Sequence, residues 1–112
     1  MKTVDVLVKA KELIQDPTKW MQGDFTNDEQ TCFCGLGAIA SVSSLDYYQV
    51  NSSDAGNYLR LAAISLDDHH DCELSFAPFN DSHSHTEVMQ AFDKAIELAT
   101  LKEIANELST SL

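Results

Sequence analysis

Long apolar runs are missing from the sequence, as are internal repeats and low-complexity segments. No stretch approaches the roughly 18 consecutive apolar residues that a membrane-spanning helix needs. The N-terminus carries an acid at Asp5 and continues without the apolar core of a signal peptide. A chain of 112 residues has the length of one domain. We therefore expect a single acidic, soluble domain over residues 1–112, located in the cytoplasm.

Basic residues are scarce: 7 Lys and Arg stand against 18 Asp and Glu, which gives a formal net charge of −11. Such a surface repels nucleic-acid phosphates and anionic lipid, which argues against direct binding to nucleic acid or membranes. Two explanations of the charge remain. Either the acids meet a basic patch on another protein, including one that normally holds DNA or RNA, or they serve solubility alone.

Cysteine is also rare, and its count of three is odd. Without a secretion signal, an odd number of cysteines argues for reduced thiols in a reducing compartment. Cys32 and Cys34 are too close in sequence to form an ordinary disulfide with each other, and nothing requires Cys72 to pair with either. No motif in the sequence indicates a cofactor.

Apolar residues at helical spacing predict helices over residues 3–15, 33–45 and 54–65. A capping box of Ser84 and Glu87 predicts the start of a last helix, which continues past Thr100 either as one long helix or as two with a bend. The second helix follows Cys34 directly. Its glycines and alanines are small enough to let a neighbouring backbone come close, so this helix is predicted to be central and buried.

The remaining segments are predicted to be connections. Residues 17–31 form a long polar loop, residues 46–53 a second loop, residues 74–79 an extended piece closed by Pro78, and residues 80–83 a turn. The sequence therefore predicts an all-α fold: a small single-domain bundle of four to five helices with long connecting loops.

Four short motifs resemble those of an uncharacterised family of small bacterial and phage proteins, known only as a domain of unknown function. They are Trp-Met-Gln-Gly at residues 20–23, Cys-Gly-Leu-Gly-Ala at residues 34–38, Phe-Asn-Asp at residues 79–81 and Asp-Lys-Ala-Ile at residues 93–96. The resemblance covers the chain to about residue 98. It implies one compact domain in a bacterial or phage setting, and it implies no activity, substrate, cofactor or catalytic residue.

Cys34 is the candidate nucleophile, because the N-terminus of a helix stabilises a thiolate. A catalytic cysteine needs an imidazole to take its proton and an Asn or Asp to orient that imidazole. His83 or His85 is the candidate base, and Asn80 or Asp81 the candidate orienting group. The alternative, which we favour, is that Cys34 is a small buried residue at a close helix contact.

Two further clusters carry weaker signals. Cysteine and histidine side chains are sufficient in number for a tetrahedral zinc site, but their spacing fits no common finger; the candidate ligands are Cys32, Cys34, His69, His70 and Cys72. An acidic loop lacks the glycine and the bidentate glutamate of a calcium loop, and reads as a solvated surface; its acids are Asp67, Asp68, Asp71 and Glu73. We predict no metal at either place.

The Asn80-Asp81 pair has two interpretations. In the structural one, the side chains bond their own backbone and fix the approach of the last helix to the second. In the functional one, they face a pocket together with Trp20 and Cys34. We favour the structural interpretation, and we expect Trp20 itself to cover the core.

The function that the sequence favours is a small acidic interaction module with a basic protein partner, possible forms being a phage-encoded inhibitor or modulator of a host nucleic-acid-binding protein. Exposed aromatic and acidic side chains are the expected contacts: Trp20, Tyr47, Tyr48, Asp67, Asp68, Asp71 and Glu73. The alternatives are a hydrolase or transferase that depends on Cys34, with His85 and Asp81 as its other residues, and a zinc-stabilised module. The oligomeric state is left open by the sequence.

Overall fold

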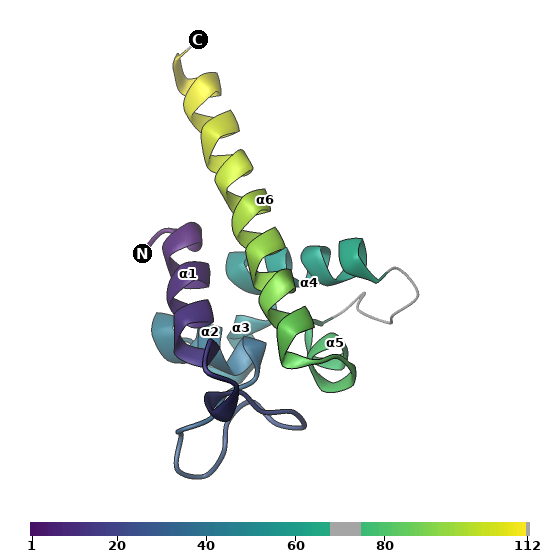
Figure 1. Ribbon diagram of the computed structural model, residues 1–112. Helices are drawn as coiled ribbons and strands as arrows, with labels where there is room; N and C mark the ends of the chain where they lie inside the picture. Colours follow the sequence, from purple (N-terminus) through teal and green to yellow (C-terminus); the bar gives the residue numbers. More distant parts are fainter. Residues whose placement is uncertain (68–74, 112) are drawn as a thin grey trace.

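The computed structural model describes residues 1–67 and 75–111, and in these residues the chain is a bundle of helices (Figure 1). In chain order they are α1 (Thr3–Ile14), the 3-10 helix η1 (Pro17–Lys19), α2 (Gly35–Ser43), α3 (Tyr47–Val50), α4 (Asp54–Leu66), α5 (Ala77–Ser82) and α6 (His85–Ser111). The only β-type pairings in the described residues are two isolated bridges, from Phe33 to Trp20 and to Thr26. The predicted all-α fold is confirmed.

The core lies where α6 packs against α1 and α4, and where α1 packs against α2. Burial of these apolar side chains provides the main driving force for folding. The largest fully buried side chains are Leu7, Ile14, Leu36, Ile39, Val50, Leu59, Phe76, Phe79, Val88, Phe92 and the polar Asn80. Asn80 is the exception in this set, because a buried amide is stable only when its hydrogen bonds are made inside the protein.

The start of α6 is set by the predicted capping box. The Glu87 backbone N–H donates to the Ser84 hydroxyl oxygen at 3.2 Å, and the Ser84 N–H donates to the Glu87 carboxylate at 3.0 Å. The pKa of Glu87 is lowered because the Ser84 N–H and the Ser84 hydroxyl both donate to its carboxylate, which favours the charged form. From there α6 runs as one helix of 27 residues, without a second helix after Thr100.

The central position of α2 is also as predicted, since all of its first six residues are buried. Cys34 is its N-cap, and the Gly37 N–H donates to the Cys34 sulfur at 3.3 Å. A Cβ atom added at Gly37 would overlap the carbonyl oxygen of Phe25, and one added at Gly35 would lie 2.6 Å from the Phe76 ring. Both glycines therefore allow close approach of a neighbouring segment.

Two predicted connections are wrong. Residues 77–82 form α5, where an extended piece and a turn were expected, because Pro78 occupies the first turn of a helix, a position in which its missing N–H costs nothing. Residues 46–53 contain α3, which begins with a capping box of Asp46 and Gln49. The loop over residues 17–31 contains η1, capped by the Asp16 carboxylate.

No helix among the described residues is both long enough and apolar enough to cross a membrane. The apolar residues of α6 alternate with charged ones along its whole length.

Candidate functional site

The buried side-chain amide of Asn80 joins three segments that are far apart in the sequence. Its Oδ1 accepts hydrogen bonds from the Trp20 indole Nε1 at 2.9 Å and from the Gly35 N–H at 3.0 Å. Its Nδ2 donates to the Met21 carbonyl at 3.0 Å and to Asp81 Oδ1 at 3.3 Å. An amide has two acceptor positions and two donor hydrogens, so Asn80 uses its full capacity.

Further contacts hold residues 20–23 against α5. The Gly23 N–H donates to Asp81 Oδ1 at 2.9 Å, and Gly23 adopts a positive φ of 89°. The Gln22 side chain donates to the carbonyls of Asn80 and His83, at 3.1 and 3.0 Å. The bonds to their own backbone that we predicted for Asn80 and Asp81 are wrong, because these side chains bond the Trp20 loop and the start of α2 instead. Asp81 also lines a pocket together with Cys34.

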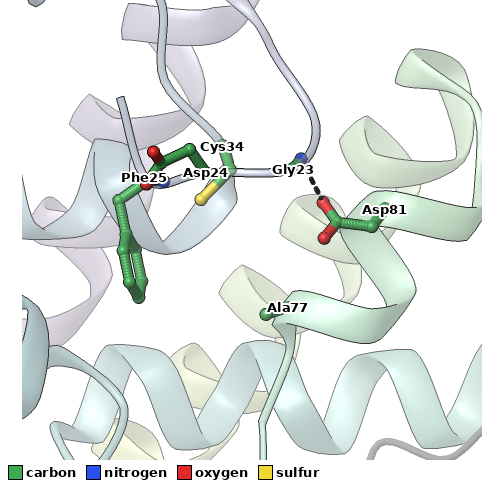
Figure 2. A pocket seen from close by; sticks show the side chains of 6 residues that line it. All are labelled: Gly23, Asp24, Phe25, Cys34, Ala77 and Asp81. Carbon is green, nitrogen blue, oxygen red and sulfur yellow. Dashed lines mark hydrogen bonds between the residues drawn. The ribbon is translucent and has the colours of Figure 1, made fainter. Parts of the chain in front are cut away.

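A pocket of about 150 Å³ lies between this loop and α5 (Figure 2). It is lined by Gly23, Asp24, Phe25, Cys34, Ala77 and Asp81. In Figure 2 the Cys34 sulfur lies between the loop and α5, and Asp81 reaches across from α5 to Gly23. The pocket thus combines two carboxylates with an apolar wall, a composition that suits a cationic group more than an anionic one.

The Cys34 thiol in this pocket is not activated. It is only 4% exposed, and burial raises its pKa to about 11, because a thiolate is poorly stabilised away from water. The bonds from the α2 N-terminus lower the pKa by less, while the charges of Asp81 and Asp24 raise it further. At neutral pH the thiol therefore stays protonated and is a poor nucleophile.

The two histidines proposed as bases have other partners. His85 donates from Nε2 to the Ile14 carbonyl at 2.8 Å, and its ring lies edge-on to Trp20 at 5.6 Å. His83 Nε2 lies 3.0 Å from the Asp67 carboxylate, and its ring stacks on Phe79 at 3.8 Å. Of the candidate catalytic set, the structure brings Asp81 into the same pocket as Cys34 and places His85 against the Trp20 ring, outside the residues that line this pocket.

A thiol-reactive probe tests the state of Cys34. We expect iodoacetamide to modify Cys34 about a hundredfold more slowly in the folded protein than in urea, since the pKa rises from 9.0 to about 11. The rate in the folded protein should increase about tenfold per pH unit, because the thiolate fraction grows with pH until the pKa is reached. Peptide mass spectrometry measures the modification of each cysteine separately. Fast modification at neutral pH would support the catalytic alternative.

The other predicted residues are dispersed. Cys32 donates from its sulfur to the Thr18 carbonyl at 3.2 Å, and among the described residues there is no cluster of ligands fit for a metal. Trp20 is half-buried against the core, whereas Tyr47 is 40% and Tyr48 95% exposed. Several of the predicted residues lie outside the described part of the chain: Asp68, His69, His70, Asp71, Cys72 and Glu73.

Asp24 and Phe25 belong to the site but were not predicted from the sequence. Phe25 stacks on Tyr47, with ring centroids 4.5 Å apart, and its carbonyl accepts from the Cys34 N–H at 3.1 Å. The available signal was Gly37, because a glycine inside a helix implies that something packs directly on the backbone.

Comparison with known proteins gives one match. The model of a family described as "Family of unknown function (DUF6197)" matches residues 1–98. No curated protein and no solved structure matches the chain. The four motifs at residues 20–23, 34–38, 79–81 and 93–96 all lie inside the matched range.

Proposed function

Because the chain belongs to the DUF6197 family, a family of unknown function, we propose its role from its own residues: a small acidic module that binds a basic protein. The proposed partner is one that normally holds nucleic acid, with this chain acting as its inhibitor or modulator. The proposed setting is the cytoplasm of a bacterial cell, as a bacterial or phage product.

The observation that carries the proposal is the distribution of charge along the chain. From Trp20 to Leu59 the sequence contains no Lys or Arg, while it contains five acids: Asp24, Asp28, Glu29, Asp46 and Asp54. This segment supplies the Trp20 loop, α2, α3 and the first half of α4. Residues 20–59 therefore contribute acids without any Lys or Arg between them to the net charge of −11, which favours attraction of a positively charged surface.

Exposed aromatic side chains lie beside these acids. Stacking of Phe25 on Tyr47 joins the loop to α3, and Gln30, Asp46 and Tyr47 line one hollow. We propose that exposed side chains of the loop and α3 form one face, which we call the acidic-aromatic surface; its members are Asp24, Asp28, Glu29, Asp46, Tyr47 and Tyr48. The phenol ring of Tyr48, 95% exposed, is available to a partner from nearly all sides.

The chemistry of this surface suits lysine and arginine. Carboxylates accept charge-assisted hydrogen bonds from both side chains, and tyrosine faces attract guanidinium groups. The pocket that contains Asp24 and Asp81 is the proposed place for one such cationic end group. In the acidic loop, the structure describes only Asp67, which is paired with His83, so the loop remains a second predicted contact.

The test begins with capture of binding proteins from a bacterial lysate, followed by purification of the identified partner and measurement of the binding constant. We expect a basic protein, weaker binding as salt rises, and displacement of the chain by duplex DNA. The variant D24N/D28N/E29Q should bind about tenfold more weakly, because three carboxylates leave the acidic-aromatic surface.

The matched control is D5N/E12Q/E107Q, which changes the net charge by the same three units at exposed positions on α1 and α6. It should bind within about threefold of the parent chain, as expected for charges outside the contact. If both variants weakened binding equally, net charge alone would explain the effect, and the proposed surface would be wrong. Binding that is indifferent to salt, or capture of acidic proteins, would contradict the proposal itself.

A further inference from the structure

The second half of α6 extends beyond the other helices (Figure 1). Its last buried residue is Ala99, at 2% exposure, although the helix continues to Ser111. The principal extents of the molecule are 49, 31 and 25 Å, so that the fold is elongated. The family match ends at residue 98, which places this projecting segment outside the part that the family shares.

The exposed face of α6 changes character along the helix. In the first half it carries polar and charged residues, such as Gln90, Asp93 and Glu97. In the projecting half the same face carries Leu101, Ile104 and Leu108, which are 56%, 47% and 63% exposed. A face of three large apolar side chains on a segment that has left its own core is typical of a helix that packs against another chain.

The spacing of the apolar residues is that of a coiled-coil seam. Leu98, Leu101, Ala105 and Leu108 are separated by three, four and three residues, which are the a and d positions of a heptad. Ile104, at a g position, widens the stripe on one side. With about 100° between successive residues, these five side chains occupy an arc of about 120°.

The charges beside the seam indicate which chain packs against it. Glu97 shares the g position with Ile104, and Lys102 is at an e position on the other side of the a and d residues. The two are five residues apart, the g-to-e′ spacing that pairs residues across a parallel two-stranded coiled coil. Within its own chain Glu97 lies 3.6 Å from Lys94, an exposed i,i+3 ion pair of the kind that contributes little. In a parallel pair of identical helices, each Glu97 therefore faces Lys102 of the second copy. In an antiparallel pair on the same seam, Lys102 faces Lys102. We propose that α6 pairs in parallel with α6 of a second copy of this chain.

Sedimentation velocity over a range from low micromolar to near-millimolar concentration tests the pairing. We expect a concentration-dependent species of twice the chain mass of 12.4 kDa. The variant L101E/L108E should remain monomeric, because it places carboxylates in the seam of both copies. The control is L61E/L66E, which makes the same change at two α4 leucines that are 44% and 46% exposed, and should still dimerise.

Charge variants test the direction of the helices. At low salt, K102E should weaken the dimer several-fold, and E97K/K102E should restore it, because the reversed pair is again complementary. Helical content by circular dichroism should stay unchanged in all variants, since these side chains are exposed. A monomer at every concentration would overturn the proposal. A dimer that K102Q strengthens would overturn the parallel arrangement, because only the antiparallel pair gains from removing that charge.

Discussion

Replacement of Asn80 by leucine should lower the free energy of unfolding by about 3–5 kcal/mol. Leucine has a similar volume but makes no hydrogen bonds, so the change leaves the Trp20 indole N–H, the Gly35 N–H and the Met21 carbonyl without the partner that now satisfies them. Each buried polar group left unpaired costs about 1–3 kcal/mol. Urea unfolding followed by circular dichroism and Trp20 fluorescence measures the loss.

The control for this variant is N57L, because the side-chain hydrogen bond of Asn57 within the described residues is a long one, 3.4 Å to the Ser52 carbonyl. It should cost less than about 1 kcal/mol. A double-mutant cycle with W20F tests whether Asn80 acts through Trp20. W20F should lower the free energy of unfolding less in N80L than in the parent chain, because the indole N–H has already lost its acceptor. Equal costs in both backgrounds would show that Asn80 does not act through Trp20.

Replacement of Gly37 by alanine should also be severe, with a loss of about 3 kcal/mol or more. In most helices this change stabilises by about 1 kcal/mol, because alanine is the better helix former. Here the added methyl group meets the Phe25 carbonyl, which is itself held by the Cys34 N–H. The loop must move outward, and the stacking of Phe25 on Tyr47 is weakened with it. Thermal unfolding gives the size of the loss.

Gly23 provides the comparison for G37A. It has a positive φ of 89°, and a Cβ atom there would have nothing within 4 Å. G23A should therefore lower the free energy of unfolding by only about 1–2 kcal/mol, the cost of a left-handed backbone conformation for a residue with a Cβ atom. If G37A were as stable as the parent chain, the close approach of the loop to α2 would be incorrect, and the pocket beside it would need a different shape.

The long elements could be predicted because their signals are local. Apolar spacing located α1 and α4 to within one residue at each end, and the Ser84 capping box located α6. The short helices were missed for different reasons. The capping box of Asp46 and Gln49 was present in the sequence but outweighed by the polar composition around it. Pro78 suits the end of an extended segment, which is what the sequence analysis predicts, but it suits the first turn of a helix equally well.

The site was only partly predictable. Cys34 was correctly placed at the start of a buried helix, and Asn80 was expected to connect the end of the fold to α2. Its partners outside α5 are separated from it by 45 to 60 residues along the chain. Hydrogen bonds of that kind follow from tertiary packing, which residue spacing does not encode. The same holds for the stacking of Phe25 on Tyr47, which brings the Trp20 loop against α3.

The attachment of the Trp20 loop through Asn80 also constrains the order in which a nascent chain can assemble. Residues 20–35 leave the ribosome long before residue 80, so their indole, amide and carbonyl groups must first be hydrated by water. Non-local contacts form only after the intervening chain has been ordered, which slows their appearance. The pocket is therefore a late product of synthesis, because it cannot be completed before α5 has been made and has docked.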